Sequence, residues 1–194
     1  MKILIGTPIH QVKDYSMERW LKNVARLQKK TPADLFLIDN SSGLDYVETV
    51  KGYCQKYGVK NYKIKHLNLD QKLSSGRRIN IAQEALRRIA IGKDYDAWFS
   101  WECDQIIPTN ALDKLIKIMK LGNFMMVVHN SWDRKIPAVF NFDMGCTLIT
   151  KKCLKLKRIT DLWTEDWLET QTLQNGGSFA NVHGAICPIY HLRK

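Results

Sequence analysis

The stretch Ala97-Trp-Phe-Ser-Trp-Glu-Cys-Asp104 decides the fold class, because a short apolar run leads directly into two carboxylates. The run 97–101 is typical of a buried strand. Side chains alternate along a strand, so Glu102 and Asp104 are expected on one side and Cys103 on the other. In parallel sheets, ligands bind beyond the carboxyl ends of the strands. The pair of acids therefore indicates a ligand site at this edge.

Apolar segments on both sides of this stretch have the spacing of either strands or amphipathic helices. Further strands are expected at residues 2–8, 34–39, 61–66, 124–128 and 145–150. Helices are expected at about residues 17–30, 44–57, 74–92, 108–122 and 163–173. This alternation predicts an α/β fold with a mostly parallel, mixed central sheet flanked by helices.

The composition is that of one globular domain, expected over residues 1–194. With 45% hydrophobic and 25% charged residues, the chain is not of the disordered or collagen-like class. We recognise no signal peptide and no apolar run near the ~20 residues that a membrane-spanning helix needs. The five cysteines are odd in number and too sparse for a disulfide scaffold, and none forms a Cys-x-x-Cys pair that would suggest a zinc site. A cytoplasmic location is therefore expected.

The chain carries a formal charge of +11, which favours acidic partners such as phosphorylated substrates, anionic lipid or nucleic acid. Its basic residues are widely spread, with one dense run from Lys151 to Arg158. Such a run is either a solvated face or a peripheral contact with lipid headgroups or a phosphorylated acceptor.

Aromatic residues divide between the expected core and one long loop. Trp98, Trp101, Trp163 and Trp167 accompany apolar segments and are expected in the core. Residues 129–144 show no periodicity, as is typical of a functional loop. Trp132 lies in this loop, where its ring could stack on a sugar or cover the site.

Three further positions at strand or helix ends are candidates for ligand contacts. Thr7 and Pro8 follow the apolar part of the first strand. Asp39 ends the second strand, where it could accept hydrogen bonds from a nucleoside or only stabilise a turn. Arg77 and Arg78 begin a helix, where they could bind phosphate or remain solvated.

The order of these motifs resembles the GT-A fold glycosyltransferases, especially the large family-two group. The motifs are Ile3-Leu-Ile-Gly-Thr-Pro8, Asp39, Gly76-Arg-Arg-Ile-Asn-Ile-Ala82, Trp101-Glu-Cys-Asp104 and Glu165-Asp166. The resemblance extends over nearly the whole chain. It differs from the family pattern in having Glu as the first acid of the metal motif, and in having Ile79 between Arg78 and Asn80.

This resemblance implies a role for each motif. Glu102 and Asp104 would form the metal site, completed by a C-terminal histidine, either His191 or His183. The ion would be Mn²⁺ or Mg²⁺, and an imidazole beside two carboxylates favours Mn²⁺. Donor binding would involve Thr7, Pro8, Asp39, Arg77, Arg78, Glu102 and Trp132.

Asp166 would then be the catalytic base, with Glu165 as the next candidate. The same acids also suit the first turn of a helix capped by Thr164 or Asp161, without any catalytic role.

The implied function is metal-dependent transfer of a sugar from a nucleoside-diphosphate donor to an acceptor hydroxyl, with inversion. The Gln-x-x-Arg-Trp motif of processive members is absent from the sequence, so a non-processive enzyme is expected. The acceptor class stays open between a glycan, a lipid-linked molecule and a small molecule, and no specific nucleic acid partner is expected. Alternatives are a nucleotidyltransferase, a basic nucleic-acid-binding module and a sugar-nucleotide binder without catalysis.

Overall fold

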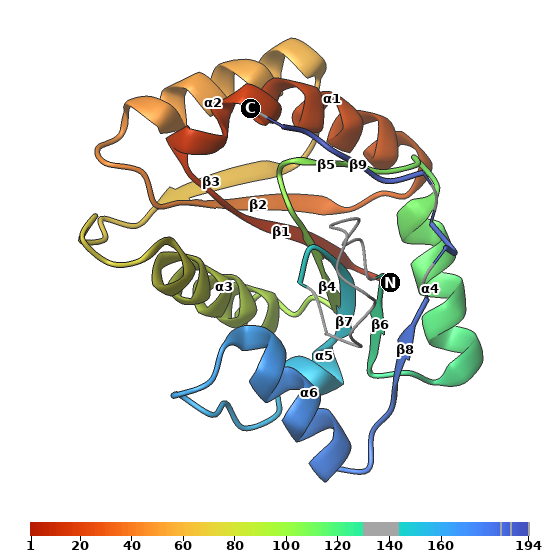
Figure 1. Ribbon diagram of the computed structural model, residues 1–194. Helices are drawn as coiled ribbons and strands as arrows, with labels where there is room; N and C mark the ends of the chain where they lie inside the picture. The colour runs from red at the N-terminus through yellow and green to blue at the C-terminus, as the bar shows by residue number, and fades with distance from the viewer. Residues whose placement is uncertain (130–143, 183, 187, 194) are drawn as a thin grey trace.

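The computed structural model describes residues 1–129, 144–182, 184–186 and 188–193, and it contains a central sheet between two layers of helices (Figure 1). Among the described residues the strand order of this sheet is β3-β2-β1-β4-β7-β6-β8. Its strands are β1 (Ile3–Ile9), β2 (Asp34–Asp39), β3 (Tyr62–His66), β4 (Ala97–Trp101), β6 (Met126–Val128), β7 (Cys146–Thr150) and β8 (Phe179–Asn181).

The sheet is mixed and mostly parallel, as the sequence predicts. Strands β3, β2, β1 and β4 are mutually parallel, whereas β7 is antiparallel to both β4 and β6. The register places Ile9 opposite Asp39, and Asp39 opposite His66. The carboxyl ends of three strands therefore share one edge, and the polar side chains that follow them meet there.

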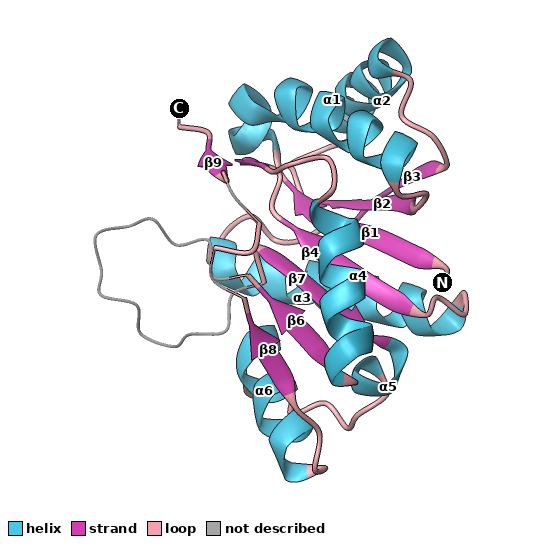
Figure 2. Ribbon diagram, turned by 90° about the vertical axis from the view of Figure 1, so that its right-hand side faces the viewer, coloured by secondary structure: helices cyan, strands magenta, loops and turns pink. Residues whose placement is uncertain are grey.

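Helices cover both faces of the sheet (Figure 1; Figure 2). They are η1 (Gln11–Lys13), α1 (Asp14–Lys30), α2 (Asp45–Tyr57), α3 (Ser75–Gly92), α4 (Ala111–Gly122), α5 (Lys151–Leu154) and α6 (Thr164–Gln174). Alternation along β1 creates the two cores: Ile3 and Ile5 pack with residues of α1, α2 and α4, and Leu4 packs with residues of α3, α5 and α6.

Gly6 on β1 is required by the close approach of a tryptophan. Trp98 of β4 donates its indole N–H to the Gly6 carbonyl over 3.0 Å. A Cβ atom at Gly6 would lie 2.4 Å from that indole nitrogen. A larger residue would therefore push β1 and the second core apart.

A second, two-stranded sheet joins the C-terminal segment to the exit of β4. Strands β5 (Gln105–Ile106) and β9 (Tyr190–His191) pair antiparallel, with Gln105 opposite His191. The Leu192 amide continues this contact by donating to the Asp104 carbonyl over 2.7 Å. Neither strand is predicted from the sequence, because two residues are too few to produce a periodic signal.

Two expectations for the core are wrong. Ile79 shares the helical spacing of Ala82 and Leu86, which predicts burial, but it is 43% exposed, and Trp163, expected in the core, is 45% exposed. Both lie where the N-termini of α3 and α6 meet: the Trp163 ring packs over Gly76, within 3.2 Å of a Cβ placed there. In the described part of the chain, no helix combines the length and the apolarity needed to cross a membrane.

Candidate active site

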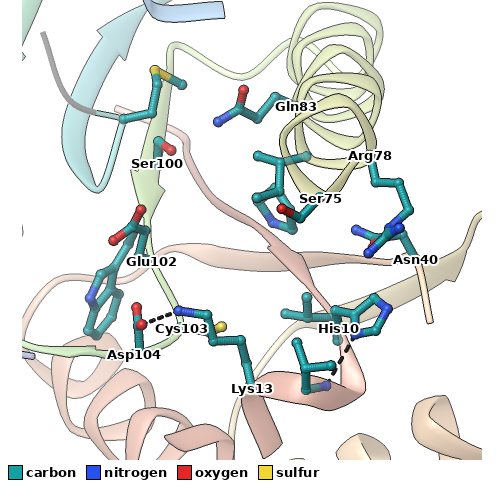
Figure 3. A pocket seen from close by; sticks show the side chains of 16 residues that line it. His10, Lys13, Asn40, Ser75, Arg78, Gln83, Ser100, Glu102, Cys103 and Asp104 are labelled. Atoms are coloured by element: carbon teal, nitrogen blue, oxygen red, sulfur yellow. Dashed lines mark hydrogen bonds and ion pairs between the residues drawn. The ribbon is translucent and has the colours of Figure 1, made fainter. Parts of the chain in front are cut away.

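A cavity of about 340 Å³ lies at the carboxyl ends of β1 and β4, against the N-terminal half of α3. Glu102 and Asp104 lie on one side of it and Arg78 on the other, as Figure 3 shows. Other lining residues include Pro8 and Lys13. The sheet edge predicted from the sequence is therefore a concave site with opposite charges on its two walls.

The two acids are brought together by a turn. Strand β4 ends at Trp101, and the Gln105 amide donates to the Glu102 carbonyl over 3.2 Å. The Trp101 indole fastens the turn by donating to the Gln105 carbonyl over 3.0 Å, and the Gln105 side-chain amide donates to Glu102 Oε2 over 2.9 Å. The expected strand alternation therefore ends before these acids, and Cys103 also lines the cavity instead of turning away.

His191 joins the two acids through the pairing of β9 with β5. One ligand atom from each of Glu102, Asp104 and His191 lies within 4.8 Å of the others. Two ligands of one ion at bond lengths of about 2.1 Å are at most about 4.2 Å apart, so small side-chain movements suffice. Asp104 Oδ1 is buried and has no hydrogen-bond partner among the described residues. Two carboxylates and an imidazole, with one unbonded buried oxygen, fit a divalent cation such as Mn²⁺.

Lys13 contacts the other oxygen of Asp104, an interaction that sequence reasoning missed. Its ammonium forms an ion pair with Asp104 Oδ2, and the Tyr15 hydroxyl lies 3.4 Å from the same oxygen. Partial burial alone would lower the pKa of Lys13, but the hydrogen bond and charge of Asp104 outweigh it and raise that pKa. Lys13 therefore stays charged. Its only sequence signal is its position after the first strand.

The Cys103 thiol is not a candidate nucleophile or metal ligand. Burial, reinforced by the charge of Asp104, raises the pKa of Cys103 to about 12. The thiol is therefore neutral at physiological pH, and the ionisable oxygens of Glu102 and Asp104 dominate this wall of the cavity.

Asp39 lies beside the cavity with both carboxylate oxygens engaged. Oδ1 accepts hydrogen bonds from the Ser41 amide and hydroxyl over 3.1 and 2.7 Å, and Oδ2 lies 2.7 Å from His66 Nδ1. The side chain is fully buried, and Asn40 lines the cavity next to it. Contact of Asp39 with a nucleoside stays a prediction, which requires the buried carboxylate to become accessible from the cavity.

The candidate residues of β1 differ in their contacts. Pro8 lines the cavity, together with His10 beyond the strand end. The Thr7 side chain is fully buried, and its hydroxyl donates to the Trp101 carbonyl over 2.7 Å. Thr7 therefore holds β1 against β4. Its effect on a ligand would be indirect, because it fixes the position of the neighbouring Pro8.

Of the two arginines at the start of α3, Arg78 lines the cavity and Arg77 does not. Ser74 caps the helix by accepting a hydrogen bond from the Arg77 amide over 3.3 Å. Arg78 Nη1 donates to the carbonyls of Gln71 and Leu73 over 3.0 and 2.5 Å, whereas its Nε has no hydrogen-bond partner. The guanidinium thus holds the preceding loop and retains donors for an anion.

Glu165 and Asp166 occupy the first turn of α6, and neither lines the cavity. The expected side-chain cap is absent from this helix, because its N-cap residue is Trp163 and no side chain bonds there. The Thr164 hydroxyl instead donates to Asn80 Oδ1 over 2.6 Å, which ties the N-terminus of α6 to α3. A catalytic role for either acid stays a prediction. Trp132 and His183 lie outside the described residues.

Several cavity residues are not among the candidates that the sequence analysis names. They are His10, Lys13, Asn40, Ser75, Gln83, Ser100 and Met144. Gln83 offers the clearest missed clue, because it is a polar residue beside the apolar stripe of α3 and is only 7% exposed.

No protein-family model and no curated protein matches this sequence. Solved structures match its fold. The mannosyltransferase PcManGT from Pyrobaculum calidifontis, in complex with GDP-Man and Mn²⁺, gives a TM-score of 0.69 at 12% identity over 95% of this chain and 55% of that chain. TarS 1-349 from S. aureus, in complex with UDP-GlcNAc, gives 0.56 at 14% identity over 80% of this chain and 47% of that chain. A197 from STIV gives 0.55 at 14% identity over 100% of this chain and 87% of that chain.

The fold is that of the GT-A-type glycosyltransferases, as the sequence resemblance implies. This chain spans about half the length of the PcManGT and TarS 1-349 chains. At these identities the likeness establishes the fold alone, so the activity has to be argued from the residues of the site.

Proposed function

We propose that this chain transfers a sugar from a nucleoside-diphosphate donor to an acceptor hydroxyl, with Mn²⁺ or Mg²⁺ held by Glu102, Asp104 and His191. The observation that carries the proposal is the convergence of these side chains within 4.8 Å at the carboxyl edge of the sheet. Complexes of the same fold with UDP-GlcNAc, and with GDP-Man and Mn²⁺, support a sugar nucleotide as donor and Mn²⁺ as the ion.

The donor diphosphate would lie between the acidic wall and α3. When bound, a divalent cation there supplies charge stabilisation for the departing nucleoside diphosphate. Arg78 lines the same space, and a guanidinium suits a phosphate oxygen. Arg77 would contribute only through long-range attraction, because its side chain does not line the cavity.

Inverting transfer needs a carboxylate that removes the proton from the attacking hydroxyl. We assign this role to Asp166, with Glu165 as the next candidate, since α6 is tied to α3 beside the cavity by Thr164 and Asn80. The transfer is expected to be non-processive. The acceptor would be a glycan, a lipid-linked molecule or a small molecule. The basic run from Lys151 to Arg158 would contact an anionic membrane surface.

Nucleotide binding tests the proposal directly. Thermal unfolding is measured with UDP, GDP, CDP and dTDP, each with and without Mn²⁺. A nucleotide at about 100 times its dissociation constant adds about 2.7 kcal/mol of stability. We expect one nucleotide to stabilise the protein only when Mn²⁺ is present, and Asp104→Asn to abolish that stabilisation.

Asp113→Asn is the matched control, because Asp113 is an exposed aspartate paired with Lys117 on α4. Unchanged Mn²⁺-dependent binding in Asp104→Asn would overturn the assignment of the site. Steeply salt-dependent binding of RNA or DNA without a metal requirement, with no response to any nucleoside diphosphate, would favour a nucleic-acid-binding module instead.

A further inference from the structure

A second cavity, of about 480 Å³, lies on another face of α3 and shares no lining residue with the candidate active site. Its lining comes from three separate parts of the chain. Lys65 is on the edge strand β3, Glu84 and Arg88 are on α3, and Arg158 follows α5. Arg158, which lies between α5 and α6, reaches α3 through its ion pair with Glu84.

Arginines converge in this cavity on one buried carboxylate. Glu84 accepts hydrogen bonds from Arg87 Nε over 2.7 Å and from Arg88 Nε over 2.8 Å, and Arg158 Nη1 lies 3.3 Å from the same carboxylate. Arg87 also donates to the Leu154 carbonyl over 2.5 Å. Glu84 therefore fixes the positions of the guanidinium groups without matching their total charge.

The lining cations have donors to spare. Each guanidinium carries five N–H donors, but among the described residues Arg88 and Arg158 each make a single polar contact, to Glu84. Arg158 Nε is buried and has no hydrogen-bond partner in the described ranges of the chain. The Arg88 side chain is 76% exposed, and Lys65 on the edge strand is exposed as well. The cavity thus presents a positive charge that the protein itself does not neutralise.

The remaining lining is apolar. It consists of Leu67, Ile81, Ala85 and Ile89. Ile81 is 40% exposed, which leaves apolar surface open beside the arginines. A cationic rim over an apolar floor matches a ligand that has an anionic group and an attached hydrocarbon or ring.

We propose that this cavity, lined by Lys65, Arg88 and Arg158, binds the phosphoryl group of a phosphate monoester whose organic part packs on Ile81 and Ile89. Arginine suits this ligand because its planar fork donates two parallel hydrogen bonds to phosphate oxygens. The phosphate could belong to a lipid headgroup or to a small free molecule. This site requires no nucleotide and no metal, so it stands apart from the proposed transferase chemistry.

The test is a titration with phenyl phosphate, followed by NMR of the arginine Nε–H groups and backbone amides in ¹⁵N-labelled protein. Saturable shifts are expected at Arg88, Arg158 and Ile81, also when the candidate active site is saturated with Mn²⁺ and a nucleoside diphosphate. The double variant Lys65→Gln/Arg88→Gln should weaken binding about tenfold, which corresponds to about 1.4 kcal/mol. Both substituted residues are exposed, and Glu84 keeps Arg87 and Arg158 in the variant.

The matched control is Lys29→Gln/Lys30→Gln, which removes the same charge from the exposed end of α1 on the other face of the sheet. The absence of shifts up to about 10 mM phenyl phosphate would overturn the proposal, as would equal weakening in both double variants, because the attraction would then be nonspecific.

Sedimentation with vesicles separates the two sources of phosphate. If phosphatidylcholine vesicles containing phosphatidic acid bind the wild type better than they bind Lys65→Gln/Arg88→Gln, the ligand is a lipid headgroup. If phenyl phosphate binds the site and these vesicles do not, the ligand is a small free phosphate monoester. The variant Asp104→Asn should still bind phenyl phosphate. Failure of the transferase proposal would appear in nucleotide binding, and failure of this proposal would appear in phenyl phosphate binding, so the two are distinguishable.

Discussion

Two buried carboxylates, Asp104 in the cavity and Glu84 on α3, have opposite degrees of hydrogen bonding. Their residues are 7% and 8% exposed. Within the part of the chain that the structure describes, Asp104 contacts one ammonium through Oδ2, and its buried Oδ1 has no partner. Both oxygens of Glu84 are bonded by arginines, and a third arginine lies within 3.3 Å. The comparison indicates that Glu84 is saturated and stabilises the fold, whereas Asp104 retains the capacity to bind a ligand.

The two carboxylates also acquire their partners differently. Arg87 and Arg88 follow Glu84 at the helical spacings of three and four residues, so these pairs form within α3. Lys13 lies 91 residues before Asp104 and meets it only when β1 and β4 pair. The ion pairs of Glu84 are therefore mainly local in sequence, whereas the ion pair of Asp104 depends on the complete sheet.

Asp166 provides the largest expected effect and extends the comparison to a third carboxylate. Its side chain is exposed and makes no hydrogen bond or ion pair with a described residue, so, unlike Glu84, it is not held by arginines. If Asp166 is the catalytic base, Asp166→Asn should lower the single-turnover rate by ~10² to 10⁴ while donor affinity and melting temperature stay near wild type.

Glu169→Gln on the same helix is the control for a lost negative charge. A first-turn acid with only a helix-dipole role predicts the opposite pattern, with a loss of ~0.3 to 1 kcal/mol of stability and full activity. A destabilised but fully active Asp166→Asn would remove Asp166 from the mechanism and make Glu165 the next carboxylate to test.

Much of the fold follows from the sequence, because the strong signals are local. Short apolar runs such as 34–39 and 97–101 correspond to β2 and β4, and helix α3 ends at Gly92 as expected. The two-residue strands β5 and β9 have no local signal, since they form only when the two ends of a long chain segment meet.

The candidate site is less predictable, because its geometry depends on contacts between distant segments. Asp104 and Glu102 stand out as acids after an apolar strand, but the unbonded oxygen of Asp104 and the approach of Lys13 are visible only in three dimensions. Ile79 is a position where the sequence pattern predicts the wrong environment. Its helical spacing predicts burial, yet the N-terminal half of α3 faces a cavity, so the side chain lines open space.

The substitution Glu84→Gln removes the charge that holds Arg87, Arg88 and Arg158. It is expected to have the second largest effect. Burial alone would raise the pKa of Glu84, but the hydrogen bonds from Arg87 and Arg88 outweigh it and hold that pKa below its ordinary value of 4.5. Near pH 7 the variant should lose about 1 to 3 kcal/mol of stability, because it leaves partly buried guanidinium groups without their counter-charge.

The same variant has a defined pH dependence. A depressed carboxyl pKa stabilises the folded state above the unfolded pKa, and this stabilisation disappears as the pH falls through the folded value. Denaturant unfolding at about pH 3 should therefore show a smaller difference from wild type than at pH 7. Glu48→Gln, which breaks an exposed pair with Lys51, should change stability by less than about 0.5 kcal/mol. An equal loss at both pH values would show that Glu84 acts through packing rather than charge.

The smallest expected effect concerns Lys13, the single cation on Asp104. In Lys13→Met the carboxylate loses its ammonium partner but keeps its buried position, so the protein should lose about 1 kcal/mol of stability in metal-free buffer. Both oxygens of Asp104 then become available to a divalent cation, and the affinity for Mn²⁺ should rise a few-fold. Calorimetric titration with Mn²⁺ and the melting temperature at saturating Mn²⁺ measure the two effects. Since the ion restores the missing positive charge, Mn²⁺ should stabilise Lys13→Met more than wild type or the exposed control Lys30→Met. An equal Mn²⁺ response in all three proteins would mean that Lys13 and the cation do not compete for Asp104, and the contrast with the saturated Glu84 would then rest on the unbonded oxygen alone.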